Sequence, residues 1–168
     1  MAKVKIDSKA FTKRLVSKFN SFANDKKEME KAAVVILRNI KADSRDGVGY
    51  DGNGFPSLKS STVERRRKLG EVNNTNRFFA PGTSNATFMG DTINKIAAKF
   101  IGGGIIELSG KGNHRKITGV RGKKLEGSDA SISDILSGLK KLGYKILGAS
   151  DKSANSIKKQ FIRYIRRK

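Results

Sequence analysis

Few residues of this sequence have the types and spacing that catalysis requires. The single histidine, His114, lies in an Asn-, Arg- and Lys-rich stretch that offers no neighbouring nucleophile or orienting acid, although a general base needs both within reach. The acidic residues Glu28 and Glu30 lie on an expected helix, and we interpret them as charges exposed to solvent. Asp129 and Asp134 flank the start of another expected helix, where carboxylates favour the positive end of the helix dipole. We therefore expect a protein that is not an enzyme.

Two glycine-rich stretches resemble ligand-binding loops but lack the required residues. Gly104 and Gly110 are separated by five residues, and Gly112 follows Lys111 where a phosphate loop needs Ser or Thr. The stretch 51–55 begins like a calcium loop, yet its fifth position is Phe and no Glu stands at the twelfth. The chain has no Cys and only one His, which excludes a thiolate site or a two-His site within one chain. We expect no cofactor and no metal.

Positive charge is the strongest compositional signal. Lys and Arg number 36 against 15 Asp and Glu, for a net charge of +21. Such a balance favours contact with polyanions, nucleic acid first. A general lysine-rich bias, or an assembly subunit whose positive face meets a negative neighbour, explains the charge equally well. Few aromatic residues lie between the cations, and Tyr164 is the only one of them that we expect to be exposed. Because bases of single strands stack on exposed aromatic side chains, we expect any nucleic-acid contact to be to the nucleic-acid backbone.

A length of 168 residues suits a single domain. No apolar run approaches the roughly 18–20 residues of a membrane span, so we expect no membrane partner. The first six residues are too short and polar for a signal peptide. Together with the lack of Cys, these features predict a protein made in a reducing cytoplasm.

The N-terminal region has the periodicity of two helices. Apolar residues spaced by four, four and three residues, Phe11, Leu15, Phe19 and Phe22, predict one helical face that packs in the core. Asn24-Asp25 predicts a break and a new helix cap. A second helix is expected over about 26–43, with a core stripe of Met29, Ala33, Ile36, Leu37 and Ile40.

The C-terminal half alternates between strand and helix patterns. Residues 93–101 and 105–108, joined by three glycines, predict a β-hairpin. A short helix is expected from Ile132 to Leu142, then a last strand over 144–147. Ser150 caps a final helix that turns Ile157, Phe161 and Ile165 inward. We predict one α+β domain, 1–168, in which N-terminal helices and a C-terminal helix pack on a small antiparallel sheet.

Polar, glycine-rich stretches interrupt these elements. We expect long loops at about 45–58, 71–87 and 110–128, and a short basic helix from Thr62 to Leu69. Loops of this length in a compact domain are often functional or serve as assembly arms.

The stretch from Asp51 onward resembles the phage virion morphogenesis, or tail completion, family. In that family an Asp-Gly, an aromatic residue, a Leu, a Ser or Thr and a basic helix follow in order. The corresponding positions are Asp51, Gly52, Phe55, Leu58, Thr62 and Lys68. The ending 147–150, Leu-Gly-Ala-Ser before the closing helix, is also similar to the family, whereas Phe88–Ile93 and His114 match it only loosely.

The resemblance implies a structural virion protein of the head-to-tail junction, in the neck or tail, which is in the host cytoplasm during assembly. We expect copies of the chain to form a ring, a hexamer in preference to a dodecamer, that joins the tail to the head connector. Its partners would be the adjoining head connector or tail terminator rings, with backbone contact to DNA as a further option. The alternative is a basic protein that binds nucleic acid without sequence specificity.

Two groups of residues are the predicted partner-binding sites. Apolar anchors tie the glycine-rich loop either to its own body or to a neighbouring subunit, and basic residues face a negative partner. The anchors are Phe55, Pro56 and Leu58, and the basic residues are Arg65, Arg66, Arg67, Lys158, Lys159, Arg163, Arg166 and Arg167. The last eleven residues hold six positive and no negative side chains, which predicts a positive outer surface on the final helix.

Overall fold

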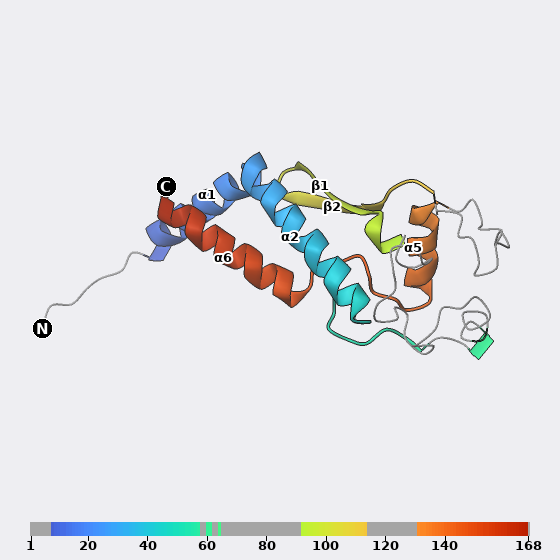
Figure 1. Cartoon of the computed structure of the whole chain (residues 1–168). Coiled ribbons are helices and arrows are strands. Elements are labelled where there is room, and N and C mark those ends of the chain that lie inside the picture. Colours follow the sequence, from blue (N-terminus) through green and yellow to red (C-terminus); the bar gives the residue numbers. More distant parts are fainter. Residues whose placement is uncertain (1–7, 58–59, 62–63, 65–91, 114–130, 168) are drawn as a thin grey trace, which may run out of the picture.

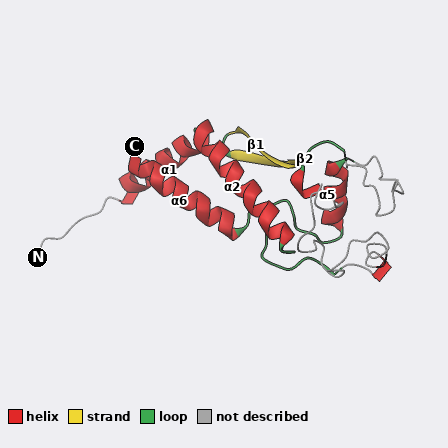
Figure 2. Ribbon diagram, in the orientation of Figure 1, coloured by secondary structure: helices red, strands yellow, loops and turns green. Residues whose placement is uncertain are grey.

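Helices from both ends of the chain pack on a small antiparallel sheet (Figures 1 and 2). The structure, a computed structural model, describes residues 8–57, 60–61, 64, 92–113 and 131–167. In these residues the elements are α1 (Ser8–Asn24), α2 (Lys26–Arg45), β1 (Ile96–Gly102), β2 (Ile105–Gly110), α5 (Ile132–Lys141) and α6 (Asp151–Arg167). The predicted α+β class is therefore confirmed.

Asp25 separates the two N-terminal helices, as predicted. Its backbone is extended, and its carboxylate accepts a hydrogen bond from the amide of Glu28 at 3.2 Å. Such a cap satisfies one of the free amides at the start of a helix. The expected stripe of α2 is buried, with Leu37 partly so, and the helix ends at Arg45, two residues beyond the predicted end.

The predicted hairpin forms, with its boundaries shifted. β1 pairs antiparallel with β2, and Gly102, Gly103 and Gly104 make the turn with φ of 108°, 56° and 75°, values that glycine adopts readily. The strand prediction from Ile93 is wrong. Thr92 and Ile93 lie in a helical turn that buries both side chains, whereas a strand points successive side chains to opposite faces. β2 runs to Gly110, so the loop expected from that residue begins after the strand.

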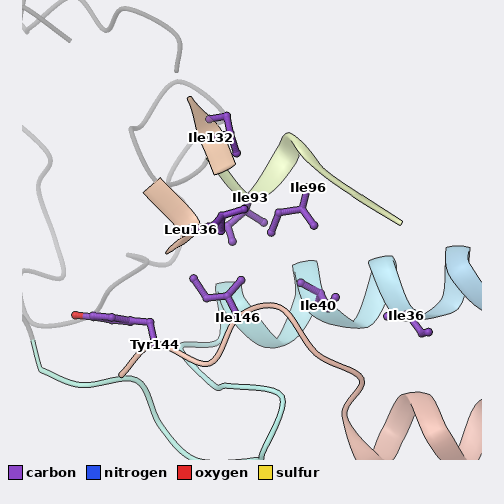
Figure 3. Packing of buried hydrophobic residues seen from close by; sticks show 8 residues of the cluster. All are labelled: Ile36, Ile40, Ile93, Ile96, Ile132, Leu136, Tyr144 and Ile146. Carbon is purple, nitrogen blue, oxygen red and sulfur yellow. The ribbon is translucent and has the colours of Figure 1, made fainter. Parts of the chain in front are cut away.

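One hydrophobic core joins α2, the start of the hairpin, α5 and the segment that follows α5 (Figure 3). The buried side chains from these four parts are Ile36, Ile40, Ile93, Ile96, Ile132, Leu136, Tyr144 and Ile146. α5 confirms the helix predicted from Ile132, and Gly143, with a φ of 88°, follows its end. The core therefore fixes residues 143–148 against the C-terminal part of α2.

A second, smaller core lies where α1, α2 and α6 meet. Phe22, Met29 and Tyr164 are buried there, and the rings of Phe22 and Tyr164 pack edge to face with centroids 5.4 Å apart. The expectation that Tyr164 is exposed is therefore wrong. Positions 157, 161 and 164 follow the spacing of a helical stripe, so Tyr164 completes the inward face of α6.

Most of the predicted core face of α1 is exposed. Phe22 is 3% exposed, but Phe11, Leu15 and Phe19 are 63%, 41% and 54% exposed. The spacing correctly places these residues on one face. However, α1 contacts α6 through Phe19 and Phe22, in its C-terminal half, and in the described part of the chain no element covers its first turns. The prediction that the whole stripe is core is wrong.

Several predictions fall on residues that the structure does not describe. The loop at 71–87, most of the loop at 110–128 and most of the basic helix at 62–69 lie outside the described residues. None of the helices in the described ranges is both long enough and apolar enough to cross a membrane.

Candidate functional site

Residues 47–56 form a folded loop, here called the docked loop, directly after α2. Val48 and Gly54 form an isolated antiparallel bridge, and the amide of Phe55 donates to the carbonyl of Gly47 at 2.7 Å. Between them, the Gly49 amide donates to the carbonyl of Asn53 at 2.8 Å. Gly47 and Gly52 have φ of 75° and 80°, which suits glycine at these two bends. The glycine-rich sequence therefore makes a tight, hydrogen-bonded turn.

The docked loop lies against residues 143–148, almost a hundred positions later in the chain. The amide of Tyr50 donates to the carbonyl of Lys145 at 2.9 Å. Side chains alternate along this segment, with Tyr144 and Ile146 buried and Lys145 exposed. The prediction of a strand over 144–147 is nevertheless wrong, because the segment has the alternation of a strand without a paired strand beside it in the described residues.

An aromatic pair anchors the loop to the core. The rings of Phe55 and Tyr144 pack edge to face with centroids 5.4 Å apart. The hydroxyl of Tyr144 donates to the carbonyl of Pro56 at 3.3 Å. Such pairs add about 0.5–1.5 kcal/mol beyond the burial of their area. Of the two binding modes left open for the loop, the structure places Phe55 against its own body.

A glycine makes room for the second aromatic contact. A Cβ atom added to Gly148 would lie 2.4 Å from two ring carbons of Tyr50. Gly49 is similarly close to the backbone of Lys145, since an added Cβ would lie 3.1 Å from its carbonyl oxygen. Distances below about 3 Å are prohibitive in close-packed protein. The close approach therefore requires glycine at position 148, whereas a Cβ at position 49 would require a small shift of its neighbours.

An ion pair closes the outer side of this contact. The Lys145 ammonium lies 2.8 Å from the Asp51 carboxylate, which also accepts hydrogen bonds from the side-chain amide and backbone amide of Asn53 at 2.8 and 3.3 Å. The hydrogen bond from Lys145, and next that from Asn53, lowers the pKa of Asp51 from 3.8 to about 2. The same contact raises the pKa of Lys145. The acidic side chain that begins the family-like motif therefore has a structural partner.

The second predicted site, the basic face of α6, is held in place by polar contacts with α2. The side-chain amide of Gln160 donates to the carbonyl and carboxylate oxygens of Glu28 at 2.7 and 2.8 Å. The hydrogen bonds from Lys31 and then Gln160 lower the pKa of Glu28. In the buried interior, Asn39 donates to the hydroxyl of Ser153 at 3.0 Å. These bonds fix the rotation of α6 about its own axis.

With this rotation, the predicted basic residues of α6 point away from the core. All five are exposed, namely Lys158, Lys159, Arg163, Arg166 and Arg167, while Ile157, Phe161 and Ile165 are half-buried as the inward side. Figure 1 shows the last turns of α6 and the first turns of α1 at the same end of the molecule. That end is far from the docked loop.

The structure brings some of the predicted site residues together and not others. Phe55 and Pro56 belong to the docked loop, and the α6 residues form a separate surface. Leu58, Arg65, Arg66 and Arg67 lie outside the described residues. Sequence reasoning missed Tyr144, Lys145 and Gly148 as partners of the loop, and Tyr50 as a contact residue within it. The only local signal for them was the glycine in the Leu-Gly-Ala-Ser ending.

The described residues contain no cluster of three or more His, Cys, Asp or Glu side chains placed to hold a metal ion. No protein family, no curated protein and no solved structure matches the chain.

Proposed function

We propose that the chain is a structural subunit of the head-to-tail junction of a phage, which forms a ring between the head connector and the tail. The observation that supports this proposal is the docked loop. The two stretches that resemble the tail completion family, the Asp-Gly motif and the Leu-Gly-Ala-Ser ending, are far apart in the sequence but belong to segments that contact each other. Asp51 of the motif pairs with Lys145, two residues before the ending, and Tyr50, the residue before the motif, lies over Gly148 of the ending.

The contact between the docked loop and residues 143–148 gives a physical reason why the Asp-Gly motif and the Leu-Gly-Ala-Ser ending would occur in the same chain. The Asp-Gly turn positions the Asp51 carboxylate for Lys145, and the following aromatic residue, Phe55, reaches Tyr144. The glycine of the ending leaves space for Tyr50. A loop that is already ordered loses little conformational entropy when a partner binds it. The docked loop would therefore present a preformed surface to a neighbouring ring subunit.

The basic face of α6 suits the same role. Five exposed cations on one helix repel one another at a level of a few tenths of a kcal/mol per close pair. A negative partner would relieve this repulsion, and in a neck that partner would be an adjoining ring or the DNA that passes through it. The role is structural, in the virion, and involves no catalysis.

Exposure of these cations also favours a second candidate, contact with nucleic-acid backbone outside any virion. The two candidates differ in assembly state and in salt dependence. We would purify the protein in about 0.5 M salt, record particle images, and titrate a DNA duplex at several salt concentrations. Rings with little DNA affinity support the neck proposal. A monomer whose log K falls steeply with log salt supports the alternative.

A charge reversal tests the role of α6 within the neck proposal. The triple variant Arg163→Glu, Arg166→Glu, Arg167→Glu should fold normally by circular dichroism and should fail to join tails to filled heads in a complementation assay. Lys27→Glu, Arg38→Glu, Lys111→Glu is the matched control, because it makes the same change in net charge at exposed positions elsewhere. Normal yields of infectious particles with the first variant would show that the basic face is only solvated charge.

A further inference from the structure

An apolar stripe on α1 lies outside both cores. Phe11, Leu15, Val16 and Phe19 are 63%, 41%, 51% and 54% exposed, although Phe22 on the same helix is 3% exposed. Single exposed apolar residues are common, but neighbouring ones on one face indicate a binding surface. The stripe continues directly from the buried Phe22, so it extends an existing core outward.

Positive charge borders this stripe on both sides. Lys9 and Lys13 follow one edge of the apolar face, and Arg14 and Lys18 follow the other, by the 3.6-residue period of the helix. α1 contains no acidic residue, and α6, at the same end of the molecule, has none after Asp151. Every ionised side chain of these two helices near the stripe is therefore a cation.

This combination of charge and apolar surface selects among the partners that could cover the stripe. A second copy that used the same face would bring two sets of cations together. Elsewhere on the described surface, exposed Val34 has Glu30 and Arg38 one helical turn away on either side, and exposed Ile105 is two residues from Glu107, which lies opposite Lys99 in the hairpin, so neither is bordered by carboxylates alone. A complementary partner must carry carboxylates on both sides of an apolar stripe, as an acidic amphipathic helix does.

The place of the stripe also favours a helix over a lipid surface. α6 touches α1 at Phe19, where the Phe19 and Phe161 rings pack with centroids 5.5 Å apart. The exposed stripe is therefore short, from Phe11 to Phe19, and part of Phe19 is already covered, whereas binding to a membrane surface scales with the apolar area that a helix buries. A partner helix would instead lie along α1 and extend the three-helix packing that already buries Phe22 and Tyr164.

We propose that Phe11, Leu15, Val16 and Phe19 of α1 bind an acidic amphipathic helix of another protein. The apolar side of that helix covers the stripe, and its carboxylates face Lys9, Lys13, Arg14 and Lys18. The inference does not rest on the proposed function, because it uses only the exposure and charge of α1.

The test uses a labelled peptide of about 18 residues, long enough for several helical turns, with a Leu stripe bordered by Glu. A second peptide has the same Leu stripe bordered by Lys. Fluorescence anisotropy with the full chain should show binding of the acidic peptide alone. Raising the salt concentration well above physiological should weaken it at least several-fold, because exposed charges are then screened.

Two variants of the chain complete the test. Phe11→Ser with Leu15→Ser should weaken binding at least about tenfold, as expected when central apolar contacts are removed. Val34→Ser with Leu142→Ser, at positions 66% and 64% exposed elsewhere, is the matched control and should bind as the parent does. Circular dichroism should show unchanged helix content in both, because all four side chains are exposed.

Several results would overturn the proposal. These are no binding of the acidic peptide, equal binding of the Lys-bordered peptide, or equal affinity of the stripe variant and the parent. Sedimentation that shows self-association lost in the stripe variant would assign the stripe to a second copy. Tighter, stripe-dependent binding to anionic vesicles or to DNA would assign it to a membrane or to nucleic acid.

Discussion

The docked loop and the first turns of α1 both carry an aromatic residue for which the sequence predicts a packed position, Phe55 as an anchor and Phe11 as core, yet the two regions have opposite environments. Phe55 packs on Tyr144, and the ring of Tyr50 lies over Gly148. Phe11 and Phe19, on α1, are 63% and 54% exposed. The loop finds its partners in a segment almost a hundred residues later, whereas in the described residues nothing covers the first turns of α1.

The charged residues of the docked loop and of the α1 end differ in the same way. At the docked loop, Asp51 is paired with Lys145 at 2.8 Å. The cations of α1 and of the last turns of α6 lie at the same other end of the molecule, and neither helix has an acidic residue beyond Asp151. The chain therefore completes one region by itself and leaves the other suited to a partner.

The largest contrast is expected along α1 itself. Phe22→Ala removes a buried ring that contacts Phe161 and Tyr164, and should lower the free energy of unfolding by about 3–5 kcal/mol. Phe11→Ala removes an exposed ring and should change it by no more than about 0.5 kcal/mol. Urea denaturation followed by circular dichroism measures both. A large loss for Phe11→Ala would mean that the chain itself covers the stripe.

A smaller contrast is expected between two glycines. Gly148→Ala places a Cβ 2.4 Å from the Tyr50 ring, and overpacking of this kind should lower the free energy of unfolding by about 1–3 kcal/mol. Gly138→Ala is the matched control, since an added Cβ meets nothing within 4 Å there. Because Gly138 lies inside α5, the control should stabilise the protein by about 0.5–1 kcal/mol. A neutral Gly148→Ala would show that Tyr50 is not held over this position.

The local sequence pattern was enough to predict much of the fold. The spacing of apolar residues located α2, α5 and α6 to within a few residues, and Asp25 marked its helix start. The three glycines marked the hairpin turn. These features depend on neighbours within four residues, which the sequence displays directly.

Predictions that needed a distant neighbour were less accurate. Periodicity shows that Phe11, Phe19 and Phe22 share a face, but not that α6 covers only the end of it. The same limit applies to Tyr164, whose burial depends on Phe22. For the site, the sequence identified Phe55 as an anchor, but Tyr144 could not be identified as its partner because more than half of the chain lies between them.

The hydroxyl of Tyr144 provides a finer test of the docked loop. Tyr144→Phe keeps the ring against Phe55 and removes the hydrogen bond to the Pro56 carbonyl. The substitution should lower the free energy of unfolding by about 1 kcal/mol, which is the net contribution of a typical hydrogen bond. Tyr50→Phe, on the neighbouring and more exposed ring, is the control and should change it less. Equal effects of the two variants would mean that the Tyr144 hydroxyl does not hold the loop.

The smallest expected effect concerns the ion pair at the outer edge of the loop. In the folded protein the pKa of Asp51 is lowered from 3.8 to about 2, chiefly by the hydrogen bond from Lys145. A lowered pKa means that this contact contributes fully above the unfolded value of 3.8 and is lost as the pH falls toward 2. Both side chains are solvent-accessible, so the effect on stability should be slight.

Direct titration is therefore the sharper measurement. The carboxyl carbon of Asp51, followed by NMR from about pH 6 to about pH 1.5, should titrate near 2. In Lys145→Met the pKa should rise toward 3.8, because the main stabilising donor is gone. Lys152→Met, which removes the partner 3.8 Å from Asp43, is the control and should leave the pKa of Asp51 unchanged. If Asp51 titrates at its ordinary value in the parent protein, the loop is not closed by this pair, and its attachment to residues 143–148 rests on Tyr50, Phe55 and Tyr144 alone.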